Sequence, residues 1–119
     1  MAPHVTLLEK IEAITRRFQR KPIQPETFVR HFEDAYHIIE ESGLPEVERL
    51  RALRDEMVEV GDLQAPSDPA DPALAYDSDL EVWAQIEQAW SDAAGLFSGD
   101  RIPLKDCTER IRTFLTDLA

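Results

Sequence analysis

Apolar residues recur at intervals of three and four along most of this chain, and this spacing places side chains on one face of an α-helix. The first such stretch covers residues 6–20, where Thr6 and Glu9 have the form of a capping box at a helix start. Lys21 and Pro22 should end it, because proline disfavours a helical conformation in the residue that precedes it. We therefore predict a first helix that buries one face of residues 6–20.

Two further helices are predicted between Pro25 and Gly61. Pro25 suits the first turn of a helix, and Gly43 is the expected stop of that helix. Pro45 begins the next apolar period, which continues to Gly61. Arginines occupy the first half of this third helix and carboxylates the second half, which is the reverse of the order that the helix dipole favours. A local preference broken in this way indicates function rather than stability.

A long loop and two more helices complete the predicted order. Residues 61–77 combine prolines and aspartates without a usable period, which is typical of a loop. A fourth helix, capped by Asp77 or Ser78, carries an apolar stripe that stops before Gly99, and a short fifth helix is predicted over residues 104–118. No strand alternation of useful length is found. The predicted fold is all-α, an antiparallel four-helix bundle with an additional short C-terminal helix.

Composition agrees with a single domain over residues 1–119. Hydrophobic residues make up 43% of the chain and charged residues 31%, near the averages of globular proteins. No apolar run approaches the roughly 18 residues that a membrane span needs, and the N-terminus lacks the pattern of a signal peptide. The single cysteine, Cys107, is expected to be a buried, inert thiol in a reducing compartment. These features predict a soluble, cytoplasmic protein without a membrane partner, and they leave its oligomeric state open.

Acidic residues are concentrated in one stretch of the chain. The net charge is −11, and residues 55–100 hold half of the 24 acidic residues without any Lys, Arg or His. A surface of one sign repels polyanions and attracts partners of the opposite charge, so direct binding of nucleic acid is not expected. A solvated surface that keeps the protein soluble is the simplest interpretation. The complete absence of positive charge, and the apolar residues between the carboxylates, favour instead a contact surface for a basic protein such as a toxin or nuclease domain.

The predicted contact residues lie in the second half of the third helix, in the loop and at the start of the fourth helix. They are Asp55, Glu56, Glu59, Asp62, Asp68, Asp71, Tyr76, Asp77, Asp79, Glu81 and Trp83. Trp83 and Trp90 lie near one face of the fourth helix, and core packing is the interpretation favoured for this pair, with an interface role for at least one of them as the alternative. An exposed tryptophan face would instead suit a non-catalytic adaptor or oligomerisation subunit.

The chain contains no motif that predicts catalysis. It lacks a glycine-rich phosphate loop, a Gly-x-Ser-x-Gly segment and the spacing of a zinc site. Asp34, His37 and Glu40 share a face of the second helix and could hold a metal. Carboxylate-bridged metal bundles, however, take a Glu-x-x-His pair from each of two helices, and the sequence has no second such pair. A solvated helix face is therefore favoured, and we predict no enzyme activity, no cofactor and no metal site.

Three segments carry a resemblance to a known family. They are Ile23-Gln-Pro-Glu-Thr-Phe28-Val-Arg-His-Phe32, the acidic end of the third helix with the loop that follows it, and Tyr76-Asp-Ser-Asp79-Leu80-Glu81. In this layout the chain resembles the colicin-like bacterial self-protection immunity proteins, the group that includes the immunity protein of the tRNA-cleaving colicin D. The resemblance covers roughly residues 5–97. Residues 98–119 lie outside the family pattern, and the segment 61–64 stands where an aromatic-rich turn is expected.

This resemblance implies a small acidic helical protein that binds the catalytic domain of a cognate nuclease toxin and blocks its substrate groove. In that account, carboxylates stand in for nucleic-acid phosphates opposite the lysines and arginines of the toxin. These carboxylates are Glu56, Glu59, Asp62, Asp68, Asp71, Asp77, Asp79 and Glu81. A phage-type inhibitor that mimics DNA against a host nuclease complex is the alternative in the same class, and only the identity of the partner separates the two.

Overall fold

Helices are the only regular secondary structure in residues 3–76, 79–93 and 102–118, which are the residues that this computed structural model describes. The α-helices are α1 (Pro3–Phe18), α2 (Val29–Glu41), α3 (Val47–Val60), α4 (Leu80–Asp92) and α5 (Leu104–Leu118). Two 3₁₀ turns lie in the connections, η1 (Pro25–Thr27) and η2 (Pro72–Leu74). The predicted all-α class is confirmed.

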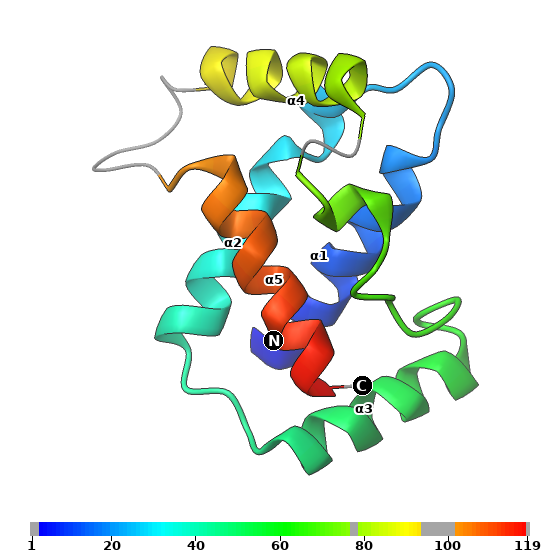
Figure 1. Ribbon diagram of the computed structural model, residues 1–119. Coiled ribbons are helices and arrows are strands. Elements are labelled where there is room, and N and C mark those ends of the chain that lie inside the picture. The colour runs from blue at the N-terminus through cyan, green and yellow to red at the C-terminus, as the bar shows by residue number, and fades with distance from the viewer. Residues whose placement is uncertain (1–2, 77–78, 94–101, 119) are drawn as a thin grey trace.

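The antiparallel four-helix bundle predicted from the sequence is not confirmed. α1 packs against α2, and α2 packs against α5, so these three helices form the centre of the fold. α3 and α4 lie across opposite ends of this centre (Figure 1). The prediction of a short fifth helix is wrong, because α5 has 15 residues whereas α2 and α4 have 13 each. α5 is a central element, and its Cys107 is fully buried, as predicted.

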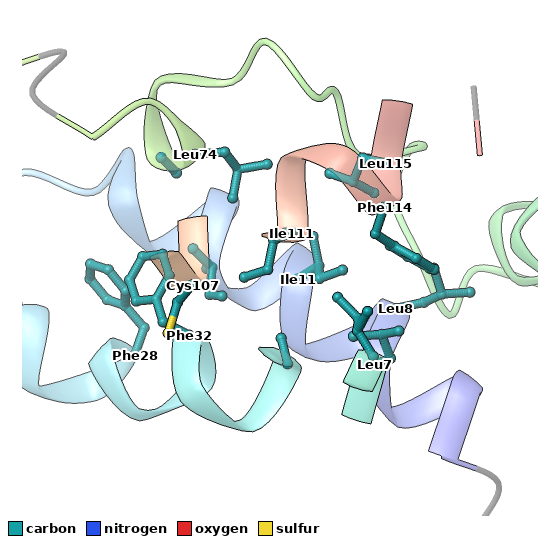
Figure 2. Close-up of a cluster of buried hydrophobic side chains, with 14 of the residues drawn as sticks. Leu7, Leu8, Ile11, Phe28, Phe32, Leu74, Cys107, Ile111, Phe114 and Leu115 are labelled. Carbon is teal, nitrogen blue, oxygen red and sulfur yellow. The ribbon is translucent and has the colours of Figure 1, made fainter. Parts of the chain in front are cut away.

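The core is built from the apolar faces of the three central helices and is closed by side chains from the connections (Figure 2). Ile11 of α1 and Ile111 of α5 lie next to each other in this cluster, and both are fully buried. Phe28 and Phe32 pack ring against ring, with centroids 6.2 Å apart. Leu74 of η2 points into the same cluster and is also fully buried. Part of the predicted loop is therefore core, and burial of Leu74 fixes the path of the chain between α3 and α4.

The starts of α1 and α2 differ from the prediction. α1 begins at Pro3, so Thr6 lies inside the helix, and the predicted capping box is wrong. Proline suits this first position because its fixed φ is already helical and no hydrogen-bond partner for its nitrogen is required there. Pro25 opens η1 and not α2, because Phe28 has φ −140° and ψ −7°, which interrupts the helical path before Val29. Both prolines start a helical turn. The sequence pattern does not show that the turn begun by Pro25 is interrupted at Phe28.

The end of α3 is confirmed at Gly61, which has a left-handed φ of +89°. Residues with a Cβ rarely adopt this conformation, and glycine adopts it without strain. The reversal allows the Leu63 amide to donate to the Met57 carbonyl at 3.1 Å, and Leu63 is buried. The loop thus leaves α3 in a fixed direction and is anchored to the core within three residues of the helix end.

Candidate partner-binding surface

The arginines in α3 have a structural role that the sequence does not reveal. Arg51 Nε donates to the carbonyl oxygen of Leu118 at 2.9 Å, and Arg54 Nη1 donates to the same oxygen at 3.3 Å. Carbonyls in the last turn of a helix lack partners within the helix and lie at the negative end of its dipole. The two guanidinium groups therefore stabilise the end of α5 and attach α3 to it. Arg54 also pairs with Asp55, with Nη2 3.0 Å from Oδ1, so Asp55 is already engaged.

The carboxylates at the other half of α3 have no comparable role. Glu56, Glu59 and Asp62 are exposed, and they form no hydrogen bond or ion pair with any residue in the described part of the chain. They lie in or just after the last two turns of α3, where negative charge is disfavoured by the dipole. Val60 stands among them with 63% of its surface exposed. We call Glu56, Glu59, Val60 and Asp62 the α3 acidic end, a group of exposed side chains that the fold itself does not use.

Two aspartates of the loop accept hydrogen bonds from nearby backbone amides and so stabilise its turns. Asp68 Oδ1 accepts a hydrogen bond from the amide of Ala70 at 2.8 Å, and Asp71 Oδ1 accepts one from the amide of Ala73 at 2.9 Å. Such bonds from an aspartate to an amide two residues later are typical of turns. The bond to Asp71 caps η2 and thereby helps to place Ala73 and Leu74 in the core. The predicted contact residues Asp68 and Asp71 therefore have a local structural explanation.

Glu12 of α1 holds the loop through a hydrogen bond to its backbone. This role was not predicted from the sequence. Its Oε2 accepts a hydrogen bond from the amide of Gln64 at 2.8 Å, and its Oε1 lies 3.6 Å from Nη1 of Arg16. Glu12 follows Leu8 by one turn and lies beside Ile11, and a carboxylate in that position on an apolar face is a signal that could have indicated a buried partner. Arg16 and Asp68 line one shared hollow of about 210 Å³. Residues 55–100 contain no basic side chain, but the folded chain places the positive charge of Arg16 close to the loop.

Replacement of Glu12 by alanine is expected to lower the free energy of unfolding by about 1–3 kcal/mol, because the amide of Gln64 loses the hydrogen bond to the buried carboxylate of Glu12. The exchange protection of that amide should fall with it, which hydrogen exchange followed by NMR would measure. Arg16→Ala provides the control, because it removes the exposed partner of Glu12 and leaves the bond to Gln64 in place. Unchanged protection of the Gln64 amide in Glu12→Ala would show that the loop is held by other contacts.

Asp79 is the N-cap of α4, whereas the sequence predicts Asp77 or Ser78. Its Oδ1 accepts hydrogen bonds from the amides of Glu81 at 3.1 Å and Val82 at 3.2 Å. Asp77 and Ser78 lie outside the described residues. Glu81 occupies the first turn of α4, where the dipole favours its charge, and it is exposed. Both described acids at this helix start therefore stabilise the helix.

Loss of the cap in Asp79→Ala is expected to lower the free energy of unfolding by about 1 kcal/mol. Asp79→Ser keeps a side-chain oxygen for the cap and removes the charge, so its free energy of unfolding should stay close to that of the unmodified protein. Urea denaturation of the two variants would measure the difference. Equal losses in both would mean that the charge stabilises α4 and the hydrogen bonds do not.

Trp83 belongs to the core and is not a surface anchor. Only 2% of its surface is exposed. Its ring contacts those of Phe18, Phe32 and Tyr76, with centroid distances of 5.9, 6.0 and 5.1 Å. Tyr76 is half-buried, and its hydroxyl donates to the carboxylate of Glu87. The prediction that Trp83 holds a partner is thus corrected, because its position on α4 faces α1 and α2.

The predicted contact residues do not form one compact patch. The C-terminal end of α3 and the N-terminal end of α4 lie at opposite ends of the molecule, and the loop runs between them along one side (Figure 1). The α3 acidic end is therefore separated from Asp79 and Glu81, with Asp68 and Asp71 between them. A partner that touched all of these carboxylates would have to cover that whole side of the protein.

The three residues of the possible metal site, Asp34, His37 and Glu40, each contact a different charged partner. Asp34 Oδ2 lies 3.2 Å from Nζ of Lys10, His37 Nδ1 lies 3.2 Å from Oε2 of Glu41, and Glu40 pairs with Arg110. No group of three or more His, Cys, Asp or Glu side chains suited to a metal ion occurs among the described residues. Each of these three side chains therefore has a separate partner, and the sequence did not predict these pairs.

Comparison with protein-family models, with curated proteins and with solved structures found no match to this chain. Within residues 3–76, 79–93 and 102–118, none of the helices combines the length and the apolar character needed to cross a membrane. The function of the protein is therefore inferred from its own residues and their arrangement.

Proposed function

We propose that this protein is of the immunity or antitoxin type and that it binds and neutralises a basic toxin or nuclease through an acidic, nucleic-acid-mimicking surface. The observation that carries this proposal is the α3 acidic end. Glu56, Glu59 and Asp62 oppose the helix dipole and pair with no described residue of the chain. Carboxylates that destabilise their own helix and have no role in folding are explained most simply by a partner that neutralises them.

The proposed mechanism is occupation of a substrate groove by negative charge. Lysine and arginine side chains that bind phosphates would meet the carboxylates of the α3 acidic end, and opposite charge would steer the two proteins together. Val60, exposed among these carboxylates, supplies an apolar contact that a partner can bury. Binding of this kind inhibits by exclusion of substrate and needs no catalytic group or cofactor. Under this proposal the protein acts in the cytoplasm, where the nuclease would meet its nucleic-acid substrate.

The other predicted residues contribute unequally to this proposal. Asp68, Asp71, Asp79 and Glu81 add negative charge to the same side of the molecule, although each also has a structural explanation. Trp83 is buried and Trp90 is partly buried against the core, so an adaptor or oligomerisation subunit would have to use other exposed side chains. A phage-type mimic of DNA remains the alternative in the same class, and its surface would need the same carboxylates.

Affinity capture from the native cell, with the protein as bait, tests the proposal. We expect capture of a protein with a basic nuclease-like domain, encoded in a neighbouring reading frame, whose cleavage of RNA or DNA stops when this protein is added. A host nuclease complex in place of a neighbouring gene product would support the phage-type alternative. Capture of partners without a basic domain, or a captured nuclease that remains active in the complex, would refute both.

A further inference from the structure

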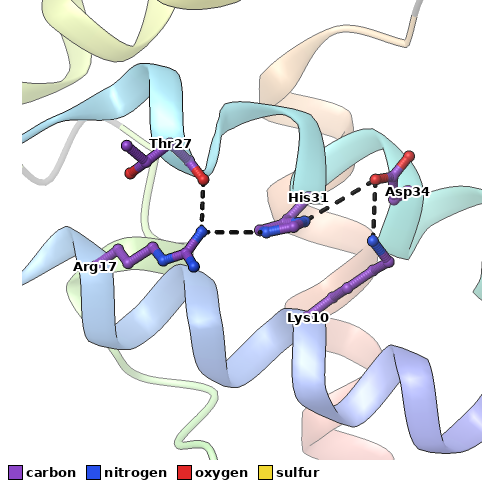
Figure 3. Close-up of polar contacts among 5 residues, drawn as sticks. All are labelled: Lys10, Arg17, Thr27, His31 and Asp34. Carbon is purple, nitrogen blue, oxygen red and sulfur yellow. Dashed lines mark hydrogen bonds and ion pairs between the residues drawn. The ribbon is translucent and has the colours of Figure 1, made fainter.

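His31 lies at the junction between α1 and α2, half-buried between side chains of both helices (Figure 3). Its Nε2 is 3.5 Å from Nη1 of Arg17 on α1, and its Nδ1 is 4.0 Å from Oδ2 of Asp34 on α2. The same oxygen of Asp34 is 3.2 Å from Nζ of Lys10. The His31 ring therefore lies between the guanidinium of Arg17 and the carboxylate of Asp34. Lys10 already neutralises that carboxylate.

The contact with Arg17 determines which ring nitrogen of His31 carries the hydrogen. A guanidinium group has only N–H donors, so Nε2 can meet it only as an acceptor. The hydrogen of the neutral imidazole then sits on Nδ1, which faces Asp34. The contact at 3.5 Å therefore fits a neutral imidazole that accepts at Nε2.

The surroundings lower the pKa of His31 below its ordinary value of 6.5. Burial is the largest cause, because a site shielded from water disfavours the charged ring. Nearby positive charges add to this effect, and they belong to Lys10, Arg17 and Arg30. Asp34 acts in the opposite direction. Glu9 of α1, which lines the same hollow as His31, is exposed to solvent.

Arg17 connects His31 to η1. The nitrogen that faces His31, Nη1, also donates to the carbonyl oxygen of Thr27 at 2.6 Å. Thr27 is the last residue of η1, and η1 packs against α4. The residue that follows, Phe28, is buried in the core. One guanidinium group of α1 therefore contacts both η1 and the first turn of α2.

We propose that this junction is a pH-sensitive latch, in which a proton taken up by His31 displaces Arg17 and loosens η1. The proton adds to the lone pair of Nε2, and the new N–H then faces the N–H groups of the guanidinium. Two donors and two positive charges oppose each other at this distance, so the nitrogen that binds His31 withdraws. Because the same nitrogen binds the Thr27 carbonyl, η1 loses its attachment to α1 in the same step.

The direction of the pH dependence follows from the lowered pKa. Below pH 6.5 the unfolded chain takes up a proton at His31 before the native protein does, so the unfolded state binds more protons. The contribution of this site to stability is unchanged above that pH. It decreases as the pH falls below 6.5 and continues to decrease until the pH reaches the native-state pKa.

An NMR titration of the His31 ring resonances in the full chain tests the latch. The midpoint is expected below 6.5, and it should rise in Arg17→Gln, which removes one of the opposing charges. Arg16→Gln is the matched control, because it removes the same charge one residue earlier, from a side chain that contacts Glu12 and not His31. A midpoint at or above 6.5, or equal shifts in the two variants, would overturn the proposal.

Exchange of the η1 amides gives a second readout. The amides of Thr27 and Phe28 donate to Gln24 and Pro25 within this turn. Their protection, corrected for intrinsic exchange rates, should fall about threefold to tenfold between about pH 7.5 and a pH about one unit below the midpoint of the His31 titration, where most rings carry the proton. His31→Gln keeps an oxygen that can accept from Arg17 and cannot take up the proton, so its protection should hold. Equal loss in that variant, or no loss in the unmodified protein, would contradict the latch.

Discussion

Replacement of Glu56, Glu59 and Asp62 by lysine is expected to slow association with a basic partner by about 10 to 10³-fold at low salt. The reason is that these exposed carboxylates, which no described residue neutralises, supply the local field that steers the partner. The salt dependence of the association rate should weaken in the same variant, because fewer charges are left to screen. Stopped-flow measurement with the captured partner at two salt concentrations would show both effects.

The stability of this triple variant is expected to change in the opposite direction. Lysines near the C-terminal end of α3 agree with its dipole, and each should raise the free energy of unfolding by about 0.3–1 kcal/mol. A loss of binding together with a gain in stability would separate function from folding. The control is Glu26, Glu109 and Asp117 replaced by lysine, which makes the same change in net charge at exposed positions elsewhere. Equal slowing in both variants would mean that net charge acts and the α3 acidic end does not.

Replacement of Trp83 by alanine is expected to lower the free energy of unfolding by about 3–5 kcal/mol. The indole is buried against aromatic rings of α1 and α2, and its loss leaves a cavity where α4 meets the centre of the fold. Urea denaturation followed by circular dichroism would measure the change. This loss is large beside the total stability of about 5–15 kcal/mol that is usual for a domain.

Leu80 is the matched control on the same helix, because 75% of its surface is exposed. Leu80→Ala should change the free energy of unfolding by no more than about 0.5 kcal/mol. Similar losses in Leu80→Ala and Trp83→Ala would contradict the assignment of Trp83 to the core. A stable Trp83→Ala protein with weakened partner binding would restore the contact role that its burial now excludes.

Patterns that act within one helical turn could be read from the sequence. The spacing of apolar residues predicted the helices, and Gly61 marked the end of α3 because its conformation is set by its own lack of a Cβ. The helix starts were predicted less well. Pro3 and Pro25 both begin a helical turn, but Thr6 and Glu9 also fit a capping box, and the sequence has no means of choosing between such local signals.

The charge order along the sequence drew attention to α3, which carries most of the surface that we propose. Glu56 and Glu59 in its acidic half, and Asp62 just after it, form no hydrogen bond or ion pair with the described residues. For the remaining carboxylates, the sequence did not separate those that stabilise a turn from those that are free to bind a partner. An aspartate that closes a turn and an aspartate displayed to a partner look the same in a sequence, because the difference lies in the amide that the side chain reaches.

The helical class, the concentration of negative charge and the change from arginines to carboxylates along α3 all follow from local sequence patterns. The contacts that these charges make depend on how the helices pack. Arg51 meets the Leu118 carbonyl 67 residues away, and Glu12 meets the Gln64 amide 52 residues away. Local patterns express forces that act over one turn of a helix, whereas partners of this kind are chosen by the packing of whole helices. The α3 acidic end stands out only after that packing has assigned partners to the charges around it.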